Sequence, residues 1–73
     1  QGPSPLIVAY ILAGTLSQLA PDMELYLERG GHLILSGLLP HQRGRILAAY
    51  GAQRLKHLKS YVRDGWLTLV LKG

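Results

Sequence analysis

Two short apolar runs, separated by a segment of helical periodicity, constrain the fold of this chain most. The runs cover residues 6–10 and 32–39, and in neither do apolar residues alternate with polar ones. Runs of this length without alternation are typical of strands buried on both faces, as in parallel sheets. Residues 12–29 lie between them and carry leucine or methionine at three- and four-residue steps, which predicts an amphipathic helical segment. This order of strand, helix and strand favours parallel pairing through a crossover connection.

A proline divides the helical segment, and more helix is predicted after the second apolar run. Pro21 separates a first helix from a second one that begins at the proline itself, because a missing N–H costs little in the first turn. Gly30 and Gly31 are predicted to stop this second helix. Residues 41–50 form a further helical region, which Gly51 ends.

The last third of the chain has the pattern of a β-hairpin. Asp64–Gly65 is a strong two-residue turn signal between residues 54–63 and 66–72. Residues 66–72 are apolar on both faces, which indicates an interior strand. The predicted fold class is therefore α/β with the order β-α-β-α-β-β, that is, two parallel strands plus a terminal β-hairpin. Residues 1–73 form a single partial domain, in which residues 1–5, with two prolines, are an irregular lead-in.

Composition excludes several classes of protein. The chain has no cysteine, so it has neither disulfides nor a thiolate metal site. Its three histidines show no ligand spacing, so no metal site is expected. The longest apolar stretch is far shorter than the roughly 20 residues of a membrane-spanning helix. The first residue is Gln1 rather than Met, so we expect a processed or excised segment.

The formal charge of +4 leaves two interpretations open. The chain is either a fragment whose acidic residues lie elsewhere, or a surface that attracts an anionic partner such as RNA. Tyr61 with Lys56 and Lys59 fits a stacking and phosphate-binding patch. The same residues also fit an exposed edge strand on which lysines prevent aggregation.

The carboxyl ends of the two apolar runs are the expected place for a site. In open parallel sheets, ligands bind beyond the carboxyl ends of the strands. These ends are residues 10–12 and 36–38.

One known pattern matches most of the chain. The segments that carry it are the strand end V-A-Y-I-L-A (residues 8–13), L-A-P (19–21), G-G (30–31), S-G-L-L (36–39) and D-G-W (64–66), together with Gln42. In this order and spacing they resemble the carboxyl-terminal part of the ribosomal protein methyltransferases that modify large-subunit protein eleven.

The resemblance implies a class I, Rossmann-like fold that binds S-adenosylmethionine and methylates amines of a ribosomal protein in the cytoplasm. This chain would supply the fourth to seventh strands, the carboxyl-terminal half of the sheet. The residues implied at the lip of the substrate and cofactor pocket are Tyr10, Ile11, Leu12, Ser36 and Gly37. The glycine-rich cofactor loop is missing from the chain, as are the ribose-binding acid and the amino-terminal domain. We therefore expect no cofactor binding and no activity from the isolated chain.

One position departs from the family pattern, which has Asn where this chain has Tyr10. An amide there can orient the accepting amine, whereas a tyrosine is bulkier and places its hydroxyl elsewhere. Tyr10 therefore indicates either a changed substrate or an inactive parent, or it is simply a packing residue.

The face of the predicted sheet that carries no helix is expected to cause self-association. Right-handed crossovers place both helical regions on one face of the sheet, so the opposite face has no helix of its own. An exposed apolar face next to an unpaired strand edge favours dimers or higher oligomers. The alternative function is a small basic α/β module that binds RNA or protein without catalysis.

Overall fold

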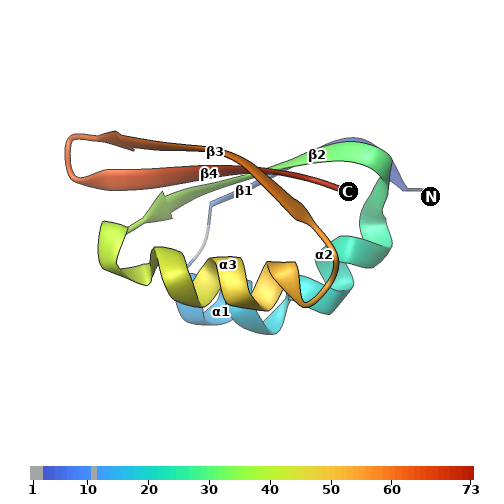
Figure 1. Ribbon diagram of the computed structural model, residues 1–73, viewed down its shortest axis with the longest axis horizontal. Helices are drawn as coiled ribbons and strands as arrows, with labels where there is room; N and C mark the ends of the chain where they lie inside the picture. The colour runs from blue at the N-terminus through green and yellow to red at the C-terminus, as the bar shows by residue number, and fades with distance from the viewer. Residues whose placement is uncertain (1–2, 11) are drawn as a thin grey trace.

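The computed structural model describes residues 3–10 and 12–73, which form a four-stranded mixed sheet with the helices packed against one face (Figure 1). The elements in chain order are β1 (Ser4–Tyr10), α1 (Ala13–Gln18), α2 (Ala20–Tyr26), β2 (Leu27–Leu38), the 3-10 helix η1 (Pro40–Gln42), α3 (Arg43–Gly51), β3 (Lys56–Arg63) and β4 (Trp66–Lys72). The predicted order of strands and helices is confirmed.

The sheet has the strand order β1-β2-β4-β3. β1 and β2 pair in parallel, and β4 runs antiparallel to both of its neighbours, β2 and β3. The predicted parallel pair, the terminal hairpin and the interior position of the last strand are therefore confirmed. Asp64 and Gly65 form the hairpin turn with φ values of 52° and 81°. Two positive φ values in a two-residue loop match the twist of the flanking strands.

The predicted irregular lead-in is wrong at its last two positions. Ser4 and Pro5 belong to β1, so the strand begins two residues earlier than predicted. The only partner of β1 in the part of the chain that the structure describes is β2. Proline is tolerated in such an edge strand, because its missing N–H removes no hydrogen bond on the open side.

The prediction that Gly30 and Gly31 stop a helix is also wrong. α2 ends at Tyr26 and β2 begins at Leu27, so both glycines lie inside a strand. Gly30 has a φ of 79°, and the pairing register between β1 and β2 shifts in this region. A Cβ at Gly31 would lie 2.9 Å from the carbonyl oxygen of Pro5. The two glycines therefore produce a bend in β2 and a close approach to β1, which is a further use of glycine in strands.

The core lies between the sheet and the helices. The alternating leucines of β2 and β4 point toward the helices and are buried, together with Leu16 of α1 and Ile46 of α3. Tyr50 of α3 is fully buried, and its hydroxyl donates a hydrogen bond of 2.7 Å to the carbonyl oxygen of Leu16. Leu16 lies in the last turn of α1, where helix carbonyls lack partners within the helix. This bond joins α3 to the end of α1.

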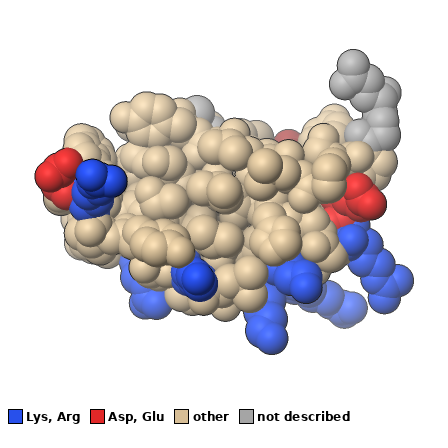
Figure 2. Space-filling model, turned by 90° about the horizontal axis from the view of Figure 1, so that it is seen from above, with Lys and Arg blue, Asp and Glu red and all other residues tan. Residues whose placement is uncertain are grey.

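The opposite face of the sheet carries no helix in the described residues, as predicted (Figure 1). Large exposed side chains cover it, among them Leu6, Val8 and Tyr10 of β1 and Trp66 of β4. Figure 2 shows that most of this face is free of charged residues and that Lys and Arg lie along one long edge. We call it the open face. No helix in residues 3–10 and 12–73 is long and apolar enough to cross a membrane.

Candidate active-site wall at the carboxyl ends of β1 and β2

The carboxyl ends of the two parallel strands meet, as the sequence predicted. Tyr10, the last residue of β1, pairs with Ser36 of β2. The pairing between β2 and β4 shifts register between Leu35 and Leu38, so Ser36 and Gly37 lie in an irregular part of the ladder. Such irregularities are frequent next to functional sites, because they change the direction in which side chains point.

Gly37 provides the surface on which the Tyr10 ring rests. Its φ is 76°, and a Cβ built on it would overlap Cε1 and Cδ1 of Tyr10. The ring therefore packs directly against the Gly37 backbone. Its outer surface is open to solvent, since Tyr10 is 73% exposed. No side chain other than hydrogen fits at residue 37 while the ring keeps this position.

A shallow cavity of about 330 Å³ lies beside this pair, lined by Tyr10, Leu12, Gly37 and Trp66. Three of these four were predicted from the sequence. Trp66 was missed, although it follows the recognised hairpin turn. It reaches the cavity because β4 pairs with β2, a long-range contact that no local pattern specifies.

The other two predicted residues have different positions. Ser36 does not line the cavity, and its hydroxyl lies 3.4 Å from that of Thr68 on β4. Ile11 falls outside the residues that the structure describes.

The cavity is aromatic on two sides and carries no carboxylate or histidine among its lining residues. It therefore offers no acid or base beyond the Tyr10 hydroxyl. Aromatic faces attract ammonium groups and exclude water from one side of them. The lining can therefore hold a cationic or an apolar group against its two rings.

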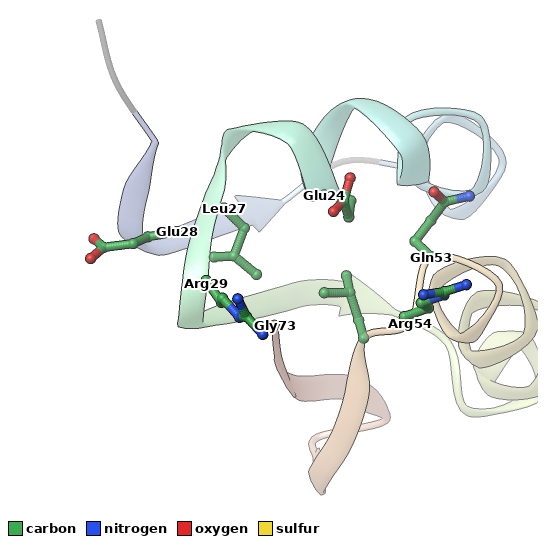
Figure 3. Close-up of a pocket in the computed structure, with 8 residues that line it drawn as sticks. Glu24, Leu27, Glu28, Arg29, Gln53, Arg54 and Gly73 are labelled. Carbon is green, nitrogen blue, oxygen red and sulfur yellow. The ribbon is translucent and has the colours of Figure 1, made fainter.

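A larger cavity of about 440 Å³ lies where β2 begins and α3 ends (Figure 3). Its lining mixes both charges and comes from Glu24, Leu27, Glu28, Arg29, Gln53, Arg54, Leu55 and Gly73. In Figure 3 the Glu28 side chain points away from the others, so the carboxylates do not converge. Within residues 3–10 and 12–73, no three His, Cys, Asp or Glu side chains group as a metal site requires.

The sheet order, the parallel pair of β1 and β2 and the helices on one face define part of a methyltransferase-like α/β fold. The crystal structure of ribosomal protein L11 methylase from Lactobacillus delbrueckii subsp. bulgaricus superposes with a TM-score of 0.89 at 30% identity, over 97% of this chain and 37% of that one. The chain belongs to the family described as ribosomal protein L11 methyltransferase (PrmA), whose model matches residues 1–73.

Curated relatives of the same description match almost the whole chain. The ribosomal protein L11 methyltransferase of Rhizobium meliloti is 49% identical over 70 residues, and that of Sinorhizobium fredii is 46% identical over 70 residues. Each match covers 96% of this chain and 24% of the relative. The chain thus spans about a quarter of the length of these relatives.

Proposed function

We propose that this chain is the carboxyl-terminal half of the sheet in an S-adenosylmethionine-dependent methyltransferase domain that modifies a ribosomal protein. The family match over residues 1–73 carries the proposal. The terminal antiparallel hairpin supports the assignment to this half, since it ends the run of parallel pairing. A cytoplasmic location follows from a ribosomal-protein substrate.

The residues present do not by themselves fit S-adenosylmethionine. Its ribose hydroxyls and its charged amino-acid part need polar partners, but the cavity at the strand ends is lined by apolar and aromatic groups. Three of the four acidic residues lie in α2 and the first part of β2, away from those strand ends: Asp22, Glu24 and Glu28. The cofactor is therefore proposed only for the longer protein, and the isolated chain is proposed to be inactive.

We assign the accepting side of the reaction to the cavity of Tyr10, Leu12, Gly37 and Trp66. The exposed aromatic rings of Tyr10 and Trp66 border it. An amine from a protein substrate would lie against these rings, held by cation–π attraction while protonated and by apolar contact when neutral. Tyr10 takes the place of the Asn in the family pattern, so the side-chain amide that would orient the amine is missing.

A chimera tests this function directly. The matching segment of the Rhizobium meliloti protein would be replaced by this chain, and methyl transfer to ribosomal protein L11 would be measured. We expect the chimera to bind S-adenosylmethionine, and Tyr10→Asn to raise transfer by about tenfold or more, because a restored amide orients the amine. Tyr61→Asn is the matched control, because Tyr61 is also an exposed tyrosine but lies on β3, and it should leave transfer unchanged.

The two parts of the proposal fail separately. A folded chimera that does not bind the cofactor would exclude the methyltransferase assignment. A chimera that binds the cofactor but whose transfer rate is the same with Tyr10 and with Asn would show that Tyr10 only packs against Gly37.

The proposed partner of the isolated chain is a second copy of itself, bound through the open face. Val8 lies near the centre of β1 on this face and is 63% exposed, which is unusual for a valine in a strand. Sedimentation equilibrium at micromolar concentration should show dimers or larger species. Val8→Lys should shift them toward the 8.0 kDa monomer. Leu25→Lys in α2, 69% exposed, should not. The proposal would be refuted if the wild-type chain sediments as a monomer and also unfolds cooperatively.

A further inference from the structure

Positive charge gathers along the edge formed by β3. The chain has eight Lys and Arg residues, and six of them lie in β3, paired or bonded to it, or just before it: Arg43, Arg54, Lys56, Lys59, Arg63 and Lys72. Figure 2 shows Lys and Arg along this long edge of the open face. Of the four acidic residues, Asp64 lies in the hairpin turn beside β3, and Glu24 and Glu28 share a cavity with Arg54, just before β3. Cations therefore outnumber acidic residues along this edge by six to three.

Three side chains converge on one point of this edge. The Ser60 hydroxyl oxygen lies 2.8 Å from Nε2 of His57 and accepts a hydrogen bond of 3.3 Å from Nε of Arg43. Ser60 and His57 belong to β3, and Arg43 is the first residue of α3, 17 positions earlier than Ser60. The bond uses only one of the five N–H donors of the guanidinium group, so four more remain for a ligand.

We propose that the β3 edge binds single-stranded RNA through its phosphodiester groups. Arg43 and Ser60 donate hydrogen bonds to one phosphate, and guanidinium binds phosphate strongly. His57 holds the Ser60 hydroxyl by donating to its oxygen, which leaves the single O–H of Ser60 free for the phosphate. Lys56 and Lys59 neutralise the phosphates next to it. The row of charge runs along eight residues of strand. Its length of about 23 Å is greater than the size of a single phosphate ion and suits a chain of phosphate groups.

An aromatic ring at the same edge supports a nucleic acid rather than an acidic protein. Tyr61 is 52% exposed and lies opposite Thr68, on the other face of β3 from Ser60. A nucleotide base can stack on such a ring, whereas an acidic peptide gains nothing comparable from it. β3 is the edge opposite to β1 in the sheet order. The phosphate site thus lies at the other edge of the sheet from β1, and Arg43, His57 and Ser60 do not line the cavity at the strand ends.

The test is binding of a fluorescein-labelled twelve-residue uridylate to the full chain, followed by anisotropy at 50 mM and 200 mM salt. We expect a Kd of about 1 to 100 μM at the lower salt and clear weakening at the higher, because counterions are released on binding. Arg43→Gln should weaken binding about fivefold. Ser60→Ala changes no charge and should weaken it about threefold.

Arg45→Gln is the matched control, because it removes the same charge from the same helix. The Arg45 guanidinium lies beside Gly14 of α1 rather than at Ser60, so its loss should weaken binding less than twofold. All three changed residues are exposed, and equal urea midpoints would verify that the variants are folded. The proposal is overturned if Arg45→Gln weakens binding as much as Arg43→Gln while Ser60→Ala has no effect, since diffuse charge alone would then explain it.

Two competitors distinguish other ligands. The first competitor is inorganic phosphate. If phosphate displaces the oligonucleotide when the phosphate concentration equals the Kd of the oligonucleotide, the site binds the free ion and the assignment to RNA is overturned. A glutamate-rich decapeptide that binds as tightly as the oligonucleotide would overturn it as well. These measurements contain neither cofactor nor methyl acceptor. A result that overturns RNA binding therefore does not affect the methyltransferase proposal.

Discussion

Gly37→Ala is expected to lower the free energy of unfolding for two separate reasons. The first is backbone strain, because the φ of 76° at Gly37 lies in the left-handed region, which costs an L-residue about 1 kcal/mol or slightly more. The second is the overlap of the new Cβ with the Tyr10 ring. That ring is mostly exposed and can swing away, so the second cost is the loss of its packing, about 1 kcal/mol. We expect Gly37→Ala to lower the free energy of unfolding by about 2 kcal/mol.

Gly30 provides the matched control. Its φ is 79°, but a Cβ there would meet nothing within 4 Å. Gly30→Ala should therefore cost only the backbone term of about 1 kcal/mol. Urea unfolding followed by circular dichroism, at one fixed protein concentration, measures both variants.

A double substitution identifies the cause of the difference. In a Tyr10→Ala background the ring is gone, so Gly37→Ala and Gly30→Ala should cost the same within about 0.5 kcal/mol. If Gly37→Ala remained about 1 kcal/mol more costly than Gly30→Ala without the ring, the packing of Tyr10 on Gly37 would not be the reason, and this description of the site would be wrong.

Four further expectations concern the core, the turn and the cofactor. Tyr50→Phe should lower the free energy of unfolding by about 1.5 kcal/mol, because the buried carbonyl oxygen of Leu16 loses its 2.7 Å hydrogen bond, whereas Tyr26→Phe at an exposed tyrosine should change it little in the same urea titration. Burial raises the pKa of Tyr50 to about 12, so the neutral phenol stabilises the fold fully below pH 10. The free energy of unfolding should therefore fall by about 2 kcal/mol between pH 10 and pH 12. The Tyr50→Phe variant, measured over the same pH range, should not show this loss. Gly65→Val, at a φ of 81° in the hairpin turn, should lower the urea midpoint, and an unchanged midpoint would contradict the turn geometry. Calorimetry with S-adenosylmethionine should show no binding to the isolated chain tighter than about 1 mM, whereas micromolar affinity would mean that most of the pocket is present.

The sequence predicted the elements that depend on local chemistry. Apolar runs without alternation identified the two parallel strands, and Asp64–Gly65 identified the hairpin because its turn requires two positive φ values. Gly30 and Gly31 were misread, since a glycine pair after a helical pattern has the same local signature whether it ends a helix or bends a strand. The difference lies in the close contact of Gly31 with Pro5, which the linear pattern does not contain.

The candidate site was predictable where it follows from strand direction and not where it depends on pairing. Tyr10, Leu12 and Gly37 were found because the carboxyl ends of parallel strands meet at one edge. Trp66 was missed because its place depends on the insertion of β4 beside β2. The contact between Arg43 and Ser60 joins residues 17 apart on a helix and a strand, and neither residue belongs to a recognisable motif.

The interior place of β4 determines the order in which this part of the protein is able to fold during synthesis. β3 leaves the ribosome before β4 but has no hydrogen-bonding partner in the sheet until β4 is available, because β4 lies between β3 and β2. The leucines at positions 67, 69 and 71, which close the core between the sheet and the helices, follow β3 in the chain and so emerge after it. A nascent chain halted before Trp66 would hold β1, β2 and the three helices around an unfilled core. Such a chain is expected to stay sensitive to protease and to bind chaperones until the hairpin has left the exit tunnel and β4 has paired with β2.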